Sequence, residues 1–288
     1  MKQLITILLT LTIGFSQSLS KEEKQIRSYI DNHNNEAIDL VEKVVNINSG
    51  TLNMEGNKKV GKIFQAELDK LGFHTYWVTY PDDVKRSGHL FAEMRGGKGK
   101  NILLIGHLDT VFEPDHPFQK YTRKGDTAYG PGVSDMKAGD VSMIYIMKAL
   151  HKIGVLQDMN LTLAFTGDEE KTGGPVSIVR KELVEAGKWA NIGLGFEGAG
   201  GMNTGTIARR SSSSWVLTTT GIQGHSSQIF KDHLGYGAIF EASRILNAFR
   251  EELAPEEYLT FNPGTIVGGT DVNYDPVNSK GTTFGKTN

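Results

Sequence analysis

Apolar residues recur along this chain with two spacings, one typical of helices and one typical of strands. The helical spacing, with apolar residues three or four positions apart, extends over residues 21–48, 57–71, 137–150 and 175–185. Apolar runs that favour strands occupy residues 74–80, 89–94, 101–105, 161–165 and 192–196, and we expect the last three to be buried. Strands that alternate with helices predict an α/β fold, in which helices flank a largely parallel, mixed sheet.

The pattern changes after Thr206. Residues 215–220 are strand-like, residues 234–253 have helical spacing, and residues 258–267 favour another strand. This order fits either more of the same sheet or a second, α+β domain. We expect the second arrangement, with a first domain over residues 21–208 and a smaller one over residues 209–288.

A histidine and a carboxylate follow the strand predicted over residues 101–105. His107 and Asp109 are two positions apart, and side chains two apart along a strand point to the same face. Asp109 can then accept the N–H of one imidazole nitrogen, which leaves the other nitrogen free to bind a metal. An ordinary structural pair is the alternative, so the weight of this run depends on the acids that follow it.

Carboxylates also follow the next apolar segments. Asp135 lies in a glycine-rich turn before a helix, Glu169 and Glu170 follow the strand over residues 161–165, and Glu197 follows the strand over residues 192–196. In open α/β sheets, ligands bind outside the carboxyl ends of the strands, so these side chains can converge on one site. Taken singly, Asp135 could be a helix N-cap and the acids could be a solvated charge run.

Three motifs carry a family resemblance. They are GHLDTV at residues 106–111, GPGVSDMKAG at residues 130–139 and GDEE at residues 167–170, with Glu197 after them. Together they resemble the co-catalytic zinc metallopeptidase family that contains glutamate carboxypeptidase, aminoacylase and succinyl-diaminopimelate desuccinylase. The similarity extends from about residue 35 to the last residue.

The resemblance implies a site for two zinc ions. His107 and Glu197 would bind one ion, Glu170 would bind the other, and Asp135 would bridge them. Three carboxylates leave two zinc ions with a net positive charge, which is what polarisation of a carbonyl requires. Oxygen and nitrogen ligands without sulfur also suit a hydrolytic zinc site with open positions.

The resemblance also implies hydrolysis by a metal-bound water. Glu169 would be the general base that takes the proton of this water and passes it to the leaving amine, and Asp109 would be the partner of His107. The expected reaction is hydrolysis of peptide or N-acyl-amino-acid amide bonds, of the glutamate carboxypeptidase type. A glutamate at position 197 is similar to what carboxypeptidases and deacylases of the family carry, which favours small peptides or N-acyl amino acids as substrates.

Residues 209–288 look like an incomplete version of the family's lid, an α+β dimerisation domain. His225, in the segment GIQGHSS, matches the lid histidine that stabilises the oxyanion in the partner's active site, although a lone histidine in a loop is often only solvated. Asn273 resembles the lid asparagine that contacts substrate. The resemblance therefore implies a homodimer formed through the lid.

The sequence departs from the family pattern at its C-terminal end. The family places a final histidine on the second zinc after the lid, and this sequence ends at Asn288 without it. We therefore expect a C-terminally truncated hydrolase. The alternative is a catalytically inactive remnant that binds zinc without hydrolysing a substrate.

Two short motifs also fit another class of enzyme, the serine β-lactamases and penicillin-binding proteins. Ser134 to Lys137 fits S-x-x-K, and Lys171 to Gly173 fits K-T-G. No S-D-N lies between them, and the two motifs are too close in sequence. We therefore favour the metallohydrolase hypothesis.

Composition indicates which kinds of partner and which cellular compartment to expect. The net charge of −2 over 288 residues gives no basic face for nucleic acid, and the absence of cysteine excludes disulfides and a lipoprotein anchor. Residues 1–20 combine Lys2, an apolar run and a small polar end, which predicts a secretory signal peptide; a membrane-anchoring helix is the alternative. We expect an exported bacterial protein, periplasmic or secreted, without stable membrane insertion after signal cleavage.

Overall fold

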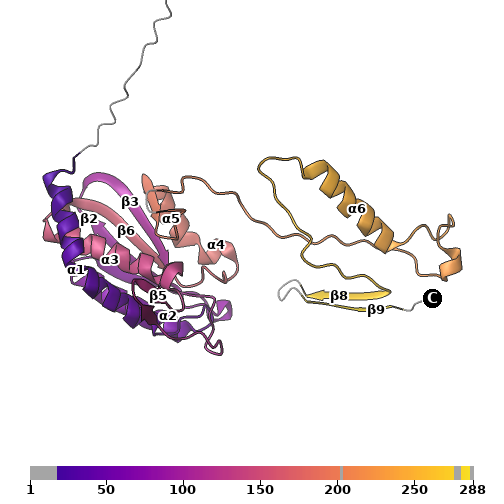
Figure 1. Ribbon diagram of the computed structural model, residues 1–288, viewed down its shortest axis with the longest axis horizontal. Helices are drawn as coiled ribbons and strands as arrows, with labels where there is room; N and C mark the ends of the chain where they lie inside the picture. The colour runs from indigo at the N-terminus through magenta and orange to yellow at the C-terminus, as the bar shows by residue number, and fades with distance from the viewer. Residues whose placement is uncertain (1–17, 202–203, 276–279, 286–288) are drawn as a thin grey trace, which may run out of the picture. The chain divides into compact units, whose positions relative to one another are not determined.

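A five-stranded mixed sheet forms the centre of the first part of the chain (Figure 1). The structure, a computed structural model, describes residues 18–201, 204–275 and 280–285. In sheet order the strands are β1 His74–Val78, β2 His89–Arg95, β6 Met159–Thr166, β3 Lys98–His107 and β7 Ile192–Gly195. β3 pairs in parallel with β6 and β7, whereas β2 pairs antiparallel with β1 and β6. The predicted helix-flanked mixed sheet is therefore confirmed, with the parallel pairing in the strands that precede the candidate site residues.

Helices cover both faces of this sheet (Figure 1). The helices of the first unit are α1 Lys21–Val45, α2 Met54–Asp69, α3 Ala138–Lys152, α4 Val176–Val179 and α5 Lys181–Trp189. Leu104 and Leu163 pack into the core formed with α1, α2 and α3, while their neighbours Leu103 and Ala164 pack on the opposite face with α5. Successive strand residues point to opposite faces, so apolar residues at every position follow from a sheet that is covered on both sides.

Local sequence sets the start of the long helices. The hydroxyl of Ser20 accepts the N–H of Glu23, and the Glu23 carboxylate accepts the N–H of Ser20, so the two form a capping box at the start of α1. Asn53 caps α2 through its side chain, which explains why α2 begins earlier than the apolar spacing predicted. The helix predicted over residues 175–185 is divided at Arg180 into α4 and α5.

The strand predicted over residues 192–196 is present as β7, but the expectation that it is buried is wrong. All four residues of β7 are exposed, and Leu194 is 43% exposed. β7 pairs with β3 along one side only, and no described strand pairs with its other side. An edge strand keeps one row of backbone groups and one flank of its side chains open, so an apolar run alone does not make it buried.

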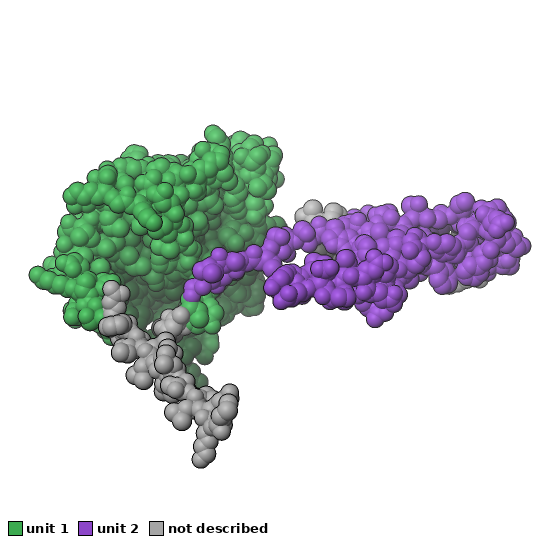
Figure 2. Space-filling model, turned by 90° about the horizontal axis from the view of Figure 1, so that it is seen from above, with its two compact units in different colours: residues 1–204 green, residues 205–288 purple. Residues whose placement is uncertain are grey.

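Short elements complete the first unit. They are the hairpin β4 Thr122–Lys124 and β5 Thr127–Tyr129, the 3₁₀ turns η1 Asp82–Val84 and η3 Leu156–Asp158, and the π-helical turn η2 Val133–Lys137. The chain divides into two units, residues 1–204 and 205–288, which Figure 2 distinguishes by colour. The expected signal segment, residues 1–20, lies outside the described residues except at its end. No helix within the described ranges is both long and apolar enough to cross a membrane.

The second unit contains one long helix and a hairpin. Its elements are η4 Ser226–Gln228, α6 Ala238–Leu253, β8 Asp271–Asp275 and β9 Lys280–Phe284. The strands predicted over residues 215–220 and 258–267 are wrong, because neither segment has a hydrogen-bonded partner strand in the described part of the unit. Trp215 instead packs edge-on against Phe249 of α6, so its apolar character serves side-chain packing without a backbone ladder.

Gly106 offers a test of the packing between β3 and α3. A Cβ added at Gly106 would meet the Asp140 carboxylate and would lie 2.7 Å from Cε of Met143. We expect Gly106→Ala to lower the free energy of unfolding by about 1–3 kcal/mol, as overpacking does in a filled core. Chemical denaturation measures this, with Gly193→Ala as the control, because a Cβ on Gly193 has no heavy atom within 4 Å. Equal stability of the two variants would contradict the close packing at Gly106.

Candidate metal centre

The end of β3 and two loops bring three potential metal ligands together. Nε2 of His107 lies 3.0 Å from Oδ1 of Asp135 and 3.3 Å from Oε1 of Glu197. One ligand atom from each of the three residues lies within 4.8 Å of the others. The His107 side chain is 1% exposed, against 65% for Asp135 and 39% for Glu197. The imidazole therefore forms the buried floor of the cluster and the carboxylates face its solvent side.

An irregular turn before α3 places Asp135. Gly132 precedes the turn with φ 75°, a left-handed conformation that glycine adopts without a steric penalty. Within η2, Asp135 and Met136 leave helical geometry. π-helical turns of this kind are frequent at functional sites. The glycine-rich motif thus directs the aspartate toward His107 and does not make it a helix N-cap, since α3 begins only at Ala138.

Lys137 fixes the same turn to the end of α1. Its side chain is fully buried, and Nζ donates hydrogen bonds to the carbonyl oxygens of Val44 and Ile47, both at 3.0 Å. A cation is favourable at the C-terminal end of a helix. Burial lowers the pKa of Lys137 to about 8. Ser134 is exposed, and the Lys137 amine is held by these carbonyls, so the geometry gives no support to a serine nucleophile activated by Lys137.

Asp109 lies behind His107 and joins it to the loop that follows β6. The Nδ1–H of His107 donates to the backbone oxygen of Asp109 at 3.0 Å, and Nδ1 is 3.5 Å from Oδ1 of its carboxylate. That carboxylate accepts the Thr51 hydroxyl at 2.7 Å and the backbone N–H groups of Glu169 and Glu170 at 3.0 and 3.1 Å. Although burial opposes ionisation, the hydrogen bonds from His107 and Thr51 hold the pKa of Asp109 below its ordinary value. Because β3 ends at His107, the turn brings the two residues together, and not strand alternation as the sequence suggested.

His107 lies in a strongly negative environment. Burial alone would lower its pKa, but the hydrogen bond with Asp109 and the charges of Asp109, Asp140 and Glu197 raise it to about 10. The imidazole therefore carries a proton that a cation would displace. Metal binding at such a histidine releases a proton and depends on pH.

The acids at the solvent side repel one another. Burial and the charge of Asp135 raise the pKa of Glu170 to about 7. Burial likewise raises the pKa of Glu197, and the charges of Asp135 and Glu169 add to the effect. Carboxylates that disfavour each other's ionisation gain free energy when a cation lies among them. The electrostatics and the donor atoms of the cluster are therefore those of a site that could hold a divalent metal.

Asp140 is a buried acid that the motif analysis missed. Its side chain lies in the first turn of α3 against Gly106, and neither carboxylate oxygen has a hydrogen-bond partner among the described residues. Burial raises the pKa of Asp140 well above its ordinary value. An acid in the first turn of a helix is common because it interacts favourably with the helix dipole, so the sequence alone gave no reason to single it out. Thr51 was missed because it is distant in sequence from every motif.

The other predicted site residues lie at different places. Glu169 is exposed and Glu170 is partly buried in the loop after β6, and Glu170 is not part of the three-residue cluster. His225 is exposed in the second unit, where its ring nitrogen accepts the N–H of Ser227 at 3.2 Å. Asn273 lies on β8 opposite Thr282 of β9. The structure thus groups His107, Asp135 and Glu197 directly.

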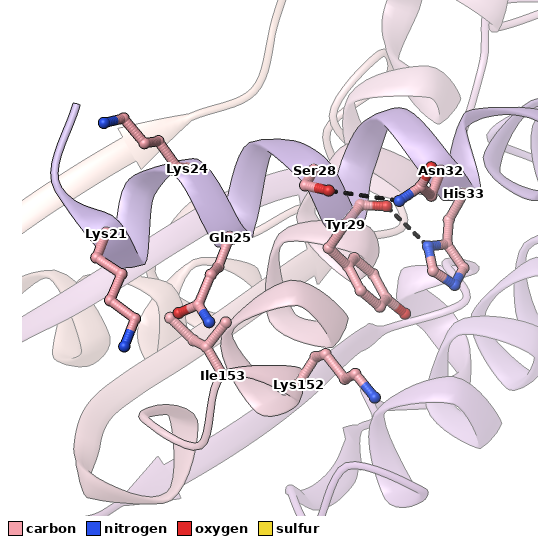
Figure 3. A pocket seen from close by; sticks show the side chains of 9 residues that line it. All are labelled: Lys21, Lys24, Gln25, Ser28, Tyr29, Asn32, His33, Lys152 and Ile153. Atoms are coloured by element: carbon pink, nitrogen blue, oxygen red, sulfur yellow. Dashed lines mark hydrogen bonds between the residues drawn. The ribbon is translucent and has the colours of Figure 1, made fainter. Parts of the chain in front are cut away.

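A groove between α1 and the end of α3 contains none of these residues (Figure 3). It has a volume of about 770 Å³, and its lining includes Lys21, Tyr29 and Lys152. Its sides are largely exposed polar residues. The groove is therefore separate from the metal cluster.

Comparison with known proteins finds a matching family and similar proteins. The family described as Peptidase family M20/M25/M40 matches residues 103–286. Carboxypeptidase G2 of Pseudomonas sp. (strain RS-16) is 32% identical over 215 residues, which cover 73% of this chain and 49% of that protein. Succinyl-diaminopimelate desuccinylase of Gluconobacter oxydans (strain 621H) is 31% identical over 202 residues, covering 66% of this chain and 49% of that protein.

The fold has solved counterparts. The crystal structure of human carnosine dipeptidase 1 matches with a TM-score of 0.51 and 19% identity, over 69% of this chain and 43% of that one. At this identity the match supports the fold alone. The chain spans about half the length of the curated relatives described above.

Asp140 predicts an unusual dependence of stability on pH. Its pKa is higher in the folded than in the unfolded chain, so its contribution is most favourable at low pH and is lost as the pH rises through the folded value. With a chelator present, Asp140→Asn should match the parent near pH 4 and melt higher at pH 8, by roughly 2–4 °C per kcal/mol relieved. Thermal melts across this range, with the exposed Asp126→Asn as the control, measure the difference. A constant offset at all pH values would argue against a buried titrating acid.

Proposed function

Since this chain belongs to Peptidase family M20/M25/M40, as its motifs predicted, we propose that it is a zinc-dependent hydrolase of peptide or N-acyl-amino-acid amide bonds, of the carboxypeptidase type. The observation that carries the proposal is the cluster of His107, Asp135 and Glu197 at the end of β3. Relatives named as a carboxypeptidase and a succinyl-diaminopimelate desuccinylase support small peptides or N-acyl amino acids as the substrate class.

The residues of the cluster fit zinc. One imidazole nitrogen and two carboxylate oxygens match the ligands of hydrolytic zinc sites, and no sulfur is present. The second nitrogen of His107 is held by the Asp109 carbonyl, an outer contact that fixes the orientation of a ligating histidine. When bound, zinc would supply Lewis acidity that polarises the substrate carbonyl and acidifies the attacking water. Glu170 would bind a second ion, and Asp135 would lie between the two.

Glu169 is the general base in this proposal. Its backbone N–H is held by Asp109 at 3.0 Å, while its carboxylate is exposed and has no hydrogen bond to a described residue. A fixed backbone with a free carboxylate suits a group that must accept a proton from water and then deliver it to the leaving amine. No nucleophile from the protein is needed for this chemistry.

A second candidate is a zinc-binding chain without hydrolytic activity. Only three of the four proposed metal ligands cluster in the described part of the chain, because Glu170 does not join them. Three ligands are enough to bind one ion with open positions. In this alternative the fold and the first metal position persist, and the second position stays empty.

The partner and the compartment are further parts of the proposal. The similarity of residues 209–288 to a dimerisation lid supports a homodimer, in which His225 would stabilise the oxyanion and Asn273 would contact substrate in the partner's site. The composition of residues 1–20 supports export to the periplasm or the medium. The net charge of −2 supports a small-molecule substrate rather than nucleic acid.

Zinc content and hydrolysis, measured on one sample, test the proposed function. The purified chain should contain two zinc ions and hydrolyse members of a panel of N-acyl-glutamate and dipeptide substrates. Glu169→Gln should retain the metal and lose activity about 10²–10⁴-fold, because only the proton transfer is removed. One zinc ion without hydrolysis would favour the second candidate, and no bound metal would reject both.

Removal of metal tests the ligand assignment independently of activity. Zinc at 100 times its dissociation constant should stabilise the fold by about 2.7 kcal/mol, and a chelator should reverse this. Glu197→Gln should abolish most of the stabilisation, because it removes a charged ligand of the cluster. Glu257→Gln, at an exposed position in the second unit, is the matched control. Equal stabilisation of the two variants by zinc would exclude Glu197 as a ligand.

A further inference from the structure

The loop after β6, residues 167–173, is held by hydrogen bonds along its whole length. Hydrogen bonds involve every residue from Gly167 to Gly173. Their partners lie on the segment before β2, on β2, on the turn after β3, on Arg180 and within the loop itself. Within this loop, Glu169 and Glu170 are the two residues to which the proposed function assigns roles. A loop that is held residue by residue can keep two acids at fixed positions despite their mutual repulsion.

Asp168 is the central contact of this loop. It is fully buried, in contrast to the two glutamates that follow it. Its Oδ1 accepts a hydrogen bond from Nη1 of Arg180, and its Oδ2 accepts the N–H of Gly173 at 2.8 Å. Both oxygens are therefore engaged within the protein, so Asp168 is neither a metal ligand nor a proton carrier, although it belongs to the same run of acids.

Arg180 holds the loop at three points. Besides the Asp168 carboxylate, its Nη2 donates to the backbone oxygen of Asp168 at 3.0 Å and to Oγ1 of Thr172 at 3.2 Å. The Arg180 side chain is 19% exposed, so most of this contact is shielded from water. The planar guanidinium can reach a carboxylate, a carbonyl and a hydroxyl at once, which the single ammonium of lysine cannot do.

His89, on β2, contacts this loop at Gly167 and α4 at Val179. It is fully buried, its Nδ1 accepts the N–H of Gly167 at 3.2 Å, and its Nε2–H donates to the carbonyl oxygen of Val179 at 2.9 Å. The same carbonyl accepts the Tyr80 hydroxyl at 2.7 Å. Burial lowers the pKa of His89, which agrees with a neutral ring that accepts at one nitrogen and donates at the other. Among the described residues, Arg180 then balances the charge of Asp168.

We infer that Asp168, Arg180 and His89 are positioning residues, which together with Asp109 fix the backbone of Glu169 and Glu170. Asp109 accepts the N–H groups of both glutamates, and the Asp168–Arg180 pair binds the backbone oxygen of Asp168 before them and Thr172 and Gly173 after them. Asp109 and Asp168 thus hold the loop through separate sets of hydrogen bonds. The inference rests on the proposed function only for what the two glutamates do.

Amide hydrogen exchange of the metal-free, full chain tests the positioning role. In Arg180→Lys the charge remains and the three-point contact is lost, so amides of residues 167–173 should exchange about tenfold faster or more, while those of residues 161–165 in β6 stay unchanged. Asp168→Asn should act in the same direction. Arg123→Lys is the matched control, because Arg123 lies on the exposed β4–β5 hairpin.

Three results would overturn the inference. Unchanged exchange in Arg180→Lys would mean that charge balance alone is needed, and unchanged exchange in both variants would mean that the loop is held elsewhere. Uniformly faster exchange across the first unit would show a general structural role. If Asp168→Asn does not fold, Arg180→Lys decides the question.

The same variants separate this inference from the proposed function. If the parent hydrolyses a substrate, Arg180→Lys should lower kcat with little change in KM, since the base is displaced and the substrate contacts remain. If the parent holds no metal and hydrolyses nothing, the proposed function fails. The exchange pattern would still decide whether Asp168 and Arg180 fix the loop.

Discussion

β3 pairs in parallel with β6 on one side and with β7 on the other, and the geometry of the candidate site depends on this pairing. His107 lies opposite Thr166, the last residue of β6, and Ile105 lies opposite Gly195, the last residue of β7. Parallel strands end at the same edge of a sheet, so the chain leaves all three strands side by side. A shift of register by one residue would turn the side chains that follow to the opposite face. The hydrophobic core on both faces of the sheet therefore fixes the site indirectly, by fixing the register.

The acids at this edge are costly to assemble, and the protein offsets the cost with specific contacts. Asp109 is stabilised as an anion by the Thr51 hydroxyl and by two backbone N–H groups. Asp168 is balanced by Arg180. Glu170, Glu197 and the buried Asp140 lie near the positive charge of His107, but burial and the neighbouring acids outweigh it, and their pKa values are raised. The acids thus fall into two groups, those that build the site and those left with unbalanced charge that a cation can relieve.

Much of the first unit was predictable because its signals are local. The strand after Gly99 and the strand before Gly167 are continuous apolar runs, and a sheet covered on both faces requires that pattern. The acids at the strand ends could be expected to meet because parallel topology converges at one edge. The second unit was less predictable: the apolar segment around Trp215 contributes to packing against α6 without forming a strand. A strand exists only where a partner provides hydrogen bonds, and a single segment of sequence does not contain its partner.

The sequence by itself determined the α/β fold, the family, and the candidate ligands His107, Asp135 and Glu197, because apolar spacing and short motifs are properties of neighbouring residues. Only the tertiary structure decided which acids are held by contacts within the protein and which remain exposed or with unbalanced charge. Asp168 and Glu169 are adjacent in the chain, yet one is fully buried against Arg180 and the other is exposed. Lys137 anchors a turn to carbonyl groups some ninety residues away in sequence. Burial and long-range hydrogen bonds arise when distant segments pack together, so no local pattern could have assigned these roles.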